Sequence, residues 1–353
     1  MPLDPKNAKF RLGSFDLLKG IGVIIFILSH SYQRYGILQN VPVVVALIGE
    51  GARTAFYVIS GLTFKEKSPS KMLKKTFQSL MIPYFWVMLA YGLLFPLVRY
   101  PFMPDWREVF TYGLRYVCAF LLGNIEYGKV IFGFEIFWCT PMYFFLSMFI
   151  ALNILNLILK IKSVRLQALC ASACVLIGTI LLSQKMFLFS LCYGLPAVGF
   201  CYVGYIIKKY NLFLRLRGNL WFYCAAAVSF LAVWLANVFT EPGFLLDMAT
   251  WFGTTFAAMI LLFGNYCITE MNLGGPGWLK KMGLYSYWII CIHSFETEAI
   301  PWFLYVQALS SYNWWLVFGL ELVLKAIILT AGCVALKAIT KWCYKRKLQR
   351  VKA

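Results

Sequence analysis

Roughly ten stretches of this chain are apolar and long enough to cross a membrane, and this feature limits the folds open to it. A helix needs about 20 apolar residues to span about 30 Å of hydrocarbon. Only 13% of the residues are charged, against roughly 25% in soluble domains. The stretches cover residues 15–33, 42–63, 79–98, 135–159, 166–183, 187–207, 219–239, 246–265, 283–300 and 314–336. We therefore expect an all-α, polytopic membrane protein that forms a single domain over residues 1–353.

The basic residues lie in alternate connections between these stretches, which predicts the orientation of the chain. Cytoplasmic loops carry an excess of Lys and Arg. Ten spans with both termini in the cytoplasm place every basic segment on that side: residues 6–11, 65–75, 160–165, 208–217, 280–281 and the tail 337–353. The intervening loops are poor in basic residues or mixed with acids, as around Glu241, around Glu296 and Glu298, and in residues 99–135. The net charge of +19 is then an orientation signal with some attraction to anionic headgroups, and we expect no nucleic-acid partner.

The first apolar stretch follows basic residues and is not followed by a small-residue cleavage site, so we expect a retained helix rather than a signal peptide. The eleven cysteines lie largely in apolar stretches and form no CxxC pair, so neither a metal site nor a disulfide framework is expected.

The only two histidines lie inside apolar stretches, His30 in the first and His293 in the ninth. Imidazole accepts and returns a proton near neutral pH, and ionisable groups within a membrane usually have a function. Both are candidate catalytic residues. The alternative is a structural histidine hydrogen-bonded between helices, and it is stronger for His293.

Lys19 precedes His30 by eleven residues, which places both side chains on one helix face about 16 Å apart along the axis. Asp16 is one turn before Lys19 and can pair with it. Lys19 is a candidate to act with His30, and the alternative is an interfacial anchor that reaches water.

The second stretch contains Glu50, Arg53 and Ser60, which are costly in lipid unless they meet partners or a water-filled cavity. Glu50 and Arg53 are one helical turn apart and can also neutralise each other. Near the start of the fourth stretch, Glu135 is a candidate buried acid close to Trp138. The preceding segment, residues 100–134, is expected outside as a long loop that could hold an acceptor.

The chain resembles the acyltransferase 3 family of integral membrane acyltransferases from Asp16 to His293. That family opens with a basic residue, ten intervening residues and a histidine, as in the run from Lys19 to His30. The other matching segments are Phe56-Tyr57-Val58-Ile59-Ser60-Gly61, Ile82-Pro83-Tyr84, Ile136-Phe137-Trp138 with Met142-Tyr143-Phe144-Phe145, Gly204-Tyr205-Ile206-Ile207-Lys208-Lys209, and Gly283-Leu284-Tyr285-Ser286-Tyr287 ahead of His293.

The resemblance implies O-acyl transfer, usually of acetyl, from cytoplasmic acyl-coenzyme A to a hydroxyl on a cell-surface or exported glycan, by a multi-pass protein of the plasma or inner membrane. His30 would be the essential residue, as a general base or as a nucleophile that carries the acyl group. Ser60 and Arg53 would bind the carbonyl or its oxyanion, and His293 would orient the acceptor or relay a proton. Glu135 and Trp138 would contact the acceptor. Acyl-coenzyme A is the expected co-substrate; the bilayer, the glycan and, as an option, a second copy of the chain are expected partners.

The donor phosphates would be bound by Lys19 and by Lys71, Lys74 and Lys75 in the basic loop before Pro83. Family members often have arginines in this loop, whereas here Gln78 stands where a second arginine is typical. Lysine binds phosphate as a point charge rather than as a bidentate fork. Simple cytoplasmic charge is the alternative interpretation of these lysines.

Other functions are compatible with this pattern. A transporter or flippase would also carry charges within its spans, although the two halves of the chain show no internal repeat. Within enzymes, the donor could be succinyl-coenzyme A, or the acceptor a small lipophilic molecule.

Overall fold

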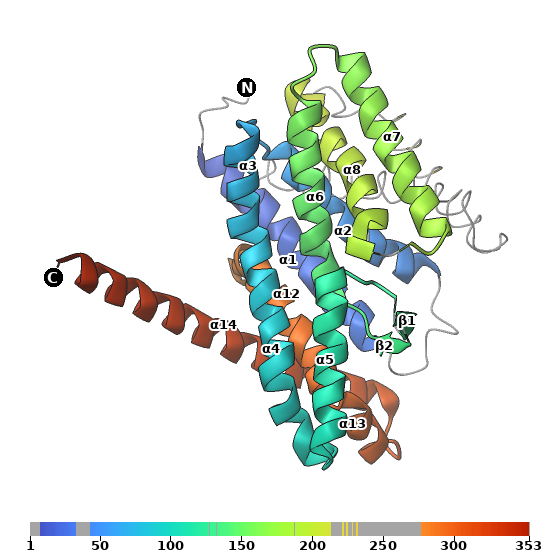
Figure 1. Ribbon diagram of the computed structural model, residues 1–353, viewed down its shortest axis with the longest axis vertical. Helices are drawn as coiled ribbons and strands as arrows, with labels where there is room; N and C mark the ends of the chain where they lie inside the picture. The colour runs from blue at the N-terminus through green and yellow to red at the C-terminus, as the bar shows by residue number, and fades with distance from the viewer. Residues whose placement is uncertain are drawn as a thin grey trace.

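The computed structural model describes residues 8–32, 43–126, 128–131, 133–186, 188–212, 221, 224, 228, 231 and 277–352. Most of these residues are helical (Figure 1). The longer helices are α1 (Ala8–Tyr32), α2 (Val43–Leu62), α4 (Ile82–Arg99), α5 (Trp106–Leu122), α6 (Tyr143–Ile158), α7 (Val164–Ser183), α8 (Leu191–Lys209), α12 (Gly277–Ala299) and α14 (Trp314–Lys352). The short elements are α3 (Pro69–Thr76), a π-helical segment (Phe77–Met81) that joins α3 to α4, three 3₁₀ turns (Tyr100–Phe102, Thr140–Met142, Leu188–Ser190), α13 (Trp302–Ala308), β1 (Lys129–Ile131) and β2 (Phe134–Ile136).

Every predicted span that falls within the described residues contains a helix. The predicted spans 219–239 and 246–265 lie outside the described residues. Four helices in the described part are long and apolar enough to cross a membrane: Pro69–Phe102, Val164–Ser183, Leu188–Lys209 and Trp314–Ala338. Large apolar side chains on their surfaces, such as Trp86, Leu93 and Leu169, are two-thirds exposed. The chain is thus a multi-pass, all-α membrane protein; the number of spans and the cytoplasmic position of both termini stay predictions.

Two expectations on the segment between α4 and α6 are wrong. Residues 100–134 do not form an open loop, because they contain α5, which packs antiparallel to α4 through Tyr91 and Tyr116. Residues 135–142 are not the start of a spanning helix. They continue a two-stranded antiparallel hairpin in which Val130 pairs with Glu135, and they end in a 3₁₀ turn. A short run of apolar residues is compatible with a strand as well as with a helix. The apolar residues after residue 135 therefore led to a wrong prediction of a helix.

Helices α1 and α12 run parallel and in close contact. A Cβ added at Gly20 would overlap the carbonyl oxygen of Leu279. A Cβ added at Gly283 would overlap the carbonyl oxygen of Asp16. Small residues allow membrane helices to approach in this way. The contact fixes the register of α1 on α12, and the two helices stay together as far as the histidines.

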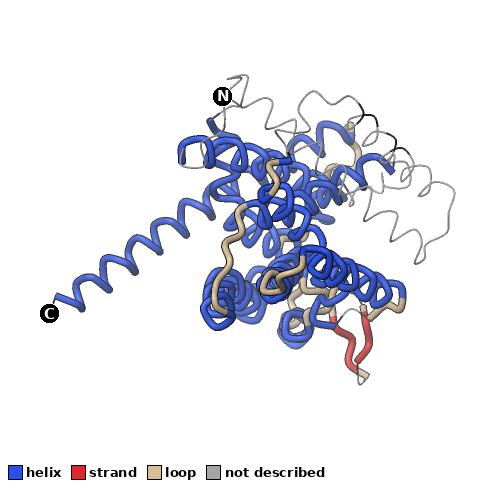
Figure 2. The backbone as a smooth tube through the Cα atoms, turned by 90° about the horizontal axis from the view of Figure 1, so that it is seen from above, coloured by secondary structure: helices blue, strands red, loops and turns tan. Residues whose placement is uncertain are grey.

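Helices α2, α6 and α8 form a second bundle beside this pair, with α7 packed against α8 (Figure 1). Its core contains Tyr57, Leu155 and Cys201. The last helix packs on the other helices over only part of its length. The C-terminal half of α14 projects away from the rest of the molecule in both views (Figures 1 and 2). Its N-terminal half packs on α12 and carries charged residues toward it.

Candidate active site

The two histidines of the chain lie against each other. Their ring centroids are 5.7 Å apart and the rings are nearly perpendicular. Phe26, one turn before His30 on α1, contacts both rings, with centroids 4.4 Å from His30 and 5.7 Å from His293. The parallel packing of α1 on α12 therefore brings together two proton-transfer groups that are more than 260 residues apart in the sequence.

His30 is the more accessible of the two histidines. Its side chain is partly exposed, and its Nδ1 donates to the carbonyl oxygen of Phe26 at 2.8 Å. A carbonyl oxygen only accepts, so the proton of the neutral ring is on Nδ1 and the lone pair is on Nε2. His30 is therefore held in a form suited to accept a proton or to attack a carbonyl carbon.

His293 is fully buried and joins a network of charged groups. Its Nδ1 donates to Oε1 of Glu296 at 2.7 Å. Glu296 also accepts from Nε1 of Trp302 at 2.8 Å and from Nζ of Lys325 at 3.3 Å. The same Nζ lies 3.3 Å from a carboxylate oxygen of Glu321. Sequence analysis missed this network.

Glu296 lies within the ninth predicted stretch, residues 283–300, although the sequence analysis also counted it with the following loop. The structure places it in the helix. α12 continues to Ala299, where Pro301 follows, and Glu296 is only 2% exposed. Its carboxylate is tolerated there because Lys325 and Trp302 donate to it. One signal was available: Glu321 and Lys325 are one turn apart inside the last apolar stretch, where charges require a partner.

Lys19 lies on α1 on the side of His30 that faces the N-terminus. Its Nζ is 3.6 Å from Asp16, which confirms the expected pairing of these two residues, and about a third of its side chain is exposed. It lines a small apolar cavity with Phe56 and Gly22. Lys19 thus does not contact the histidines, but it borders the same helix interface.

Arg53 projects from α2 toward the N-terminal ends of α6 and α8. Its Nη1 donates to the hydroxyl of Tyr143 at 2.6 Å, and the guanidinium lies 4.5 Å from the ring centroid of Tyr193. Arg53 and Phe26 line one small cavity, so the cation shares this cavity with the ring that contacts both histidines. Glu50 was predicted as a possible partner of Arg53, and its side chain is outside the described residues.

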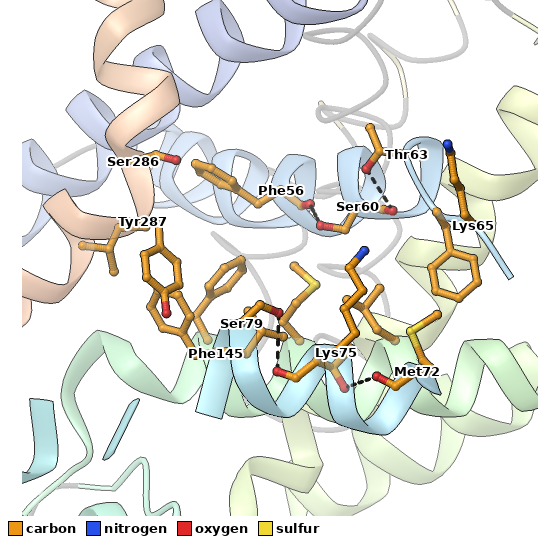
Figure 3. A pocket seen from close by; sticks show the side chains of 17 residues that line it. Phe56, Ser60, Thr63, Lys65, Met72, Lys75, Ser79, Phe145, Ser286 and Tyr287 are labelled. Atoms are coloured by element: carbon orange, nitrogen blue, oxygen red, sulfur yellow. Dashed lines mark hydrogen bonds between the residues drawn. The ribbon is translucent and has the colours of Figure 1, made fainter. Parts of the chain in front are cut away.

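Ser60 and Lys75 line a larger cavity of about 230 Å³ between α2, α3, α6 and α12 (Figure 3). Lys75 projects from α3 into the space beneath α2, and Lys65 stands at one end of the cavity (Figure 3). The hydroxyl of Ser60 donates to the carbonyl oxygen of Phe56 at 2.8 Å. Tyr287 closes the cavity on the α12 side, with its hydroxyl buried.

The larger cavity adjoins the cavity beside Arg53. Both are lined by Phe56, Phe144 and Ile290. These three apolar side chains stand between the two cavities. Phe26, which lines the cavity beside Arg53, contacts both histidine rings. Ser60 lines the cavity that contains Lys65 and Lys75, so the structure does not bring it to the histidine pair.

The remaining predicted residues are more scattered. Lys71 and Lys74 are exposed on α3 and do not line the larger cavity, whereas Lys65, which was not singled out, does. Glu135 is not the buried acid that we expected, because it lies on β2, keeps 39% of its side chain exposed and pairs with Arg115 at 2.8 Å. Trp138 is partly buried and packs against the core between α4, α5 and α12.

Comparison with known proteins identifies one family. The family model Acyl_transf_3, described as an acyltransferase domain, matches residues 12–341. No curated protein and no solved structure matches the chain.

Proposed function

Because the chain belongs to the acyltransferase 3 family and is a multi-pass membrane acyltransferase, we propose that it moves an acetyl group from acetyl-coenzyme A to a hydroxyl of a cell-surface or exported glycan. The observation that supports this most is the contact between His30 and His293, near two neighbouring cavities of which one is lined by Lys65 and Lys75. Acyl transfer needs a cationic site for the donor phosphates and a proton acceptor at the thioester. The lysines and the histidines are the candidates for these two roles.

The larger cavity is the proposed donor site. Lys65 and Lys75 bind the phosphates of the coenzyme, and the cytoplasmic charge of their loop suits a donor that is made in the cytoplasm. The acyl end then passes Phe56, Phe144 and Ile290 toward Phe26. Lys71, Lys74 and Lys19 raise the local positive potential that attracts the donor, without lining this cavity.

The transfer itself takes place at the histidine pair. The acceptor hydroxyl loses its proton to an imidazole as its oxygen attacks the thioester carbonyl carbon, the C–S bond breaks, and the coenzyme thiolate leaves and takes up a proton. Alternatively, Nε2 of His30 first takes the acyl group and then passes it to the hydroxyl. Arg53 is the better candidate to bind the oxyanion, because it lines the cavity that Phe26 also lines. The hydroxyl of Ser60 already donates to the carbonyl oxygen of Phe56.

The acceptor reaches this site from the opposite side to the lysines, in the plasma or inner membrane. The β1–β2 hairpin, α5 and the loop after β2 lie there, with Glu135 exposed enough to bind a sugar hydroxyl and Trp138 able to pack on a sugar ring. The same geometry would accept succinyl as the acyl group or a small lipophilic molecule as the acceptor, and an assay with each donor and acceptor separates these cases.

Replacing Lys75 with Gln should raise the KM for acetyl-coenzyme A about tenfold and leave kcat nearly unchanged. One charge-assisted hydrogen bond to a phosphate is worth about 1.5 kcal/mol, and about 1.4 kcal/mol is tenfold in affinity. The measurement is donor-dependent thiol release by the purified protein with its acceptor. Lys74→Gln is the matched control, because Lys74 is on the same helix but outside the cavity. Equal effects of the two changes would contradict this donor site, and an absence of thiol release from the wild type would contradict the proposed function.

A further inference from the structure

Three buried charged residues form a network behind His293. In the described part of the chain it consists of the carboxylates of Glu296 and Glu321 and the ammonium of Lys325, all at most 2% exposed. Lys325 lies 3.3 Å from each carboxylate. Buried charges of this kind are stabilised by their ion pairs and hydrogen bonds, so the groups that face His293 act on its charge.

The two histidines have different partners on Nδ1. His30 donates to a neutral carbonyl oxygen, whereas His293 donates to the carboxylate of Glu296. A carboxylate stabilises an imidazolium by its charge, and a carbonyl stabilises it only by its dipole. The carboxylate of Glu296 therefore offsets part of the cost of placing a charged ring at the buried position of His293.

The two histidines also differ in access. His30 is partly exposed and His293 is 0% exposed, so a substrate can reach His30 first and His293 lies behind it. Hydrogen bonds hold Glu296 and its helix turn from several sides. Trp302 of α13 donates to Glu296, Thr297 lies 3.3 Å from it, and the hydroxyl of Tyr91 on α4 donates to the carbonyl oxygen of Ser294. The next acid on α12, Glu298, accepts instead from the hydroxyl of Tyr116.

We propose that Glu296 is a positioning residue for acyl transfer. It holds the proton of neutral His293 on Nδ1, presents the Nε2 lone pair on the other side of the ring, and stabilises the imidazolium when His293 takes a proton. The proposal rests on the proposed function. In the transfer, the hydroxyl proton goes to Nε2 of His30 and from there to Nε2 of His293; it returns to the coenzyme thiolate when the C–S bond has broken, and both rings are neutral again.

The test combines nitrogen NMR with kinetics on Glu296→Gln. Because the chain has two histidines, ¹⁵N-histidine labelling gives signals from two rings only, and the His30→Ala variant assigns those of His293. We expect neutral His293 to carry its proton on Nδ1 in the wild type and in Glu298→Gln, and to shift toward the Nε2-protonated form in Glu296→Gln. We also expect Glu296→Gln to lower kcat about 100-fold with the donor KM unchanged, and Glu298→Gln to stay close to the wild type.

Several outcomes would overturn the proposal. A wild-type His293 that carries its proton on Nε2 would do so even if Glu296→Gln failed to fold. An equal loss of kcat in Glu296→Gln and Glu298→Gln would indicate a structural role of this helix end. If the wild type transferred no acyl group from any donor, the proposed function would fail, while the NMR spectra would still show whether Glu296 fixes the tautomer of His293.

Discussion

Replacing His30 with alanine is expected to lower the rate of acyl transfer by a factor of about 100 to 10,000, the range that a positioned general base supplies. His30 is the more exposed histidine, and its Nδ1 donates to the carbonyl oxygen of Phe26, so Nε2 is the nitrogen that carries the lone pair. If His30 carries the acyl group instead, the loss is at least as large. The measurement is transfer of label from radiolabelled acetyl-coenzyme A by equal amounts of purified, folded protein.

Ser31→Ala is the matched control for this change. Ser31 is the next residue of α1, is fully buried and is not part of the histidine pair. The rate of this variant should stay close to that of the wild type, and its elution from size-exclusion chromatography should match that of His30→Ala. Transfer at the wild-type rate by His30→Ala would contradict a catalytic role of this residue.

Gly283→Ala is expected to destabilise the protein by about 1 to 3 kcal/mol, the usual range for overpacking, and to reduce transfer as well. The added Cβ would overlap the carbonyl oxygen of Asp16, so α12 must move away from α1. A backbone carbonyl cannot rotate away as a flexible side chain can. Because the same contact sets the register of the two helices, the distance between His30 and His293 would change too.

Gly319→Ala provides the comparison, since it adds the same methyl group to a helix position where no atom of the described residues lies within 4 Å of the new Cβ. Alanine is favoured over glycine within helices by roughly 0.5–1 kcal/mol, so this variant should be as stable as the wild type or slightly more stable. Thermal unfolding in one detergent measures both variants. Equal unfolding temperatures for Gly283→Ala and the wild type would show that α1 and α12 are not in the close contact described above.

The sequence predicted the helices well where apolar length was the deciding property. The stretches 42–63 and 166–183 correspond closely to α2 and α7. The sequence analysis failed between α4 and α6, where it expected a loop instead of α5. The charged residues Arg107, Glu108 and Arg115 are typical of a loop, but here they lie on a helix whose aromatic face packs against α4. Gly128 and Gly133 have positive φ in the hairpin, a local requirement that apolar length does not reveal.

The candidate site was predicted in part for the same reason. Chemistry singled out His30 and His293, because an imidazole within an apolar stretch is rare, but nothing in the sequence shows that the two rings meet. That contact depends on Gly20 and Gly283 and on the register they set. The sequence analysis named Lys71, Lys74 and Lys75 as candidates to bind the donor. Only the fold shows that Lys75 lines the larger cavity while Lys71 and Lys74 do not. Glu296 was missed because its compensating cation, Lys325, is on another helix.

The most direct test of the acyltransferase account is to incubate the purified protein with radiolabelled acetyl-coenzyme A and membranes that contain its native glycans. We expect label in the glycan as an ester that hydroxylamine cleaves, with one free thiol released for each label transferred. Bound donor with no thiol release and no ester, together with glycan movement across the membrane of protein-containing vesicles, would contradict the account and favour a transporter.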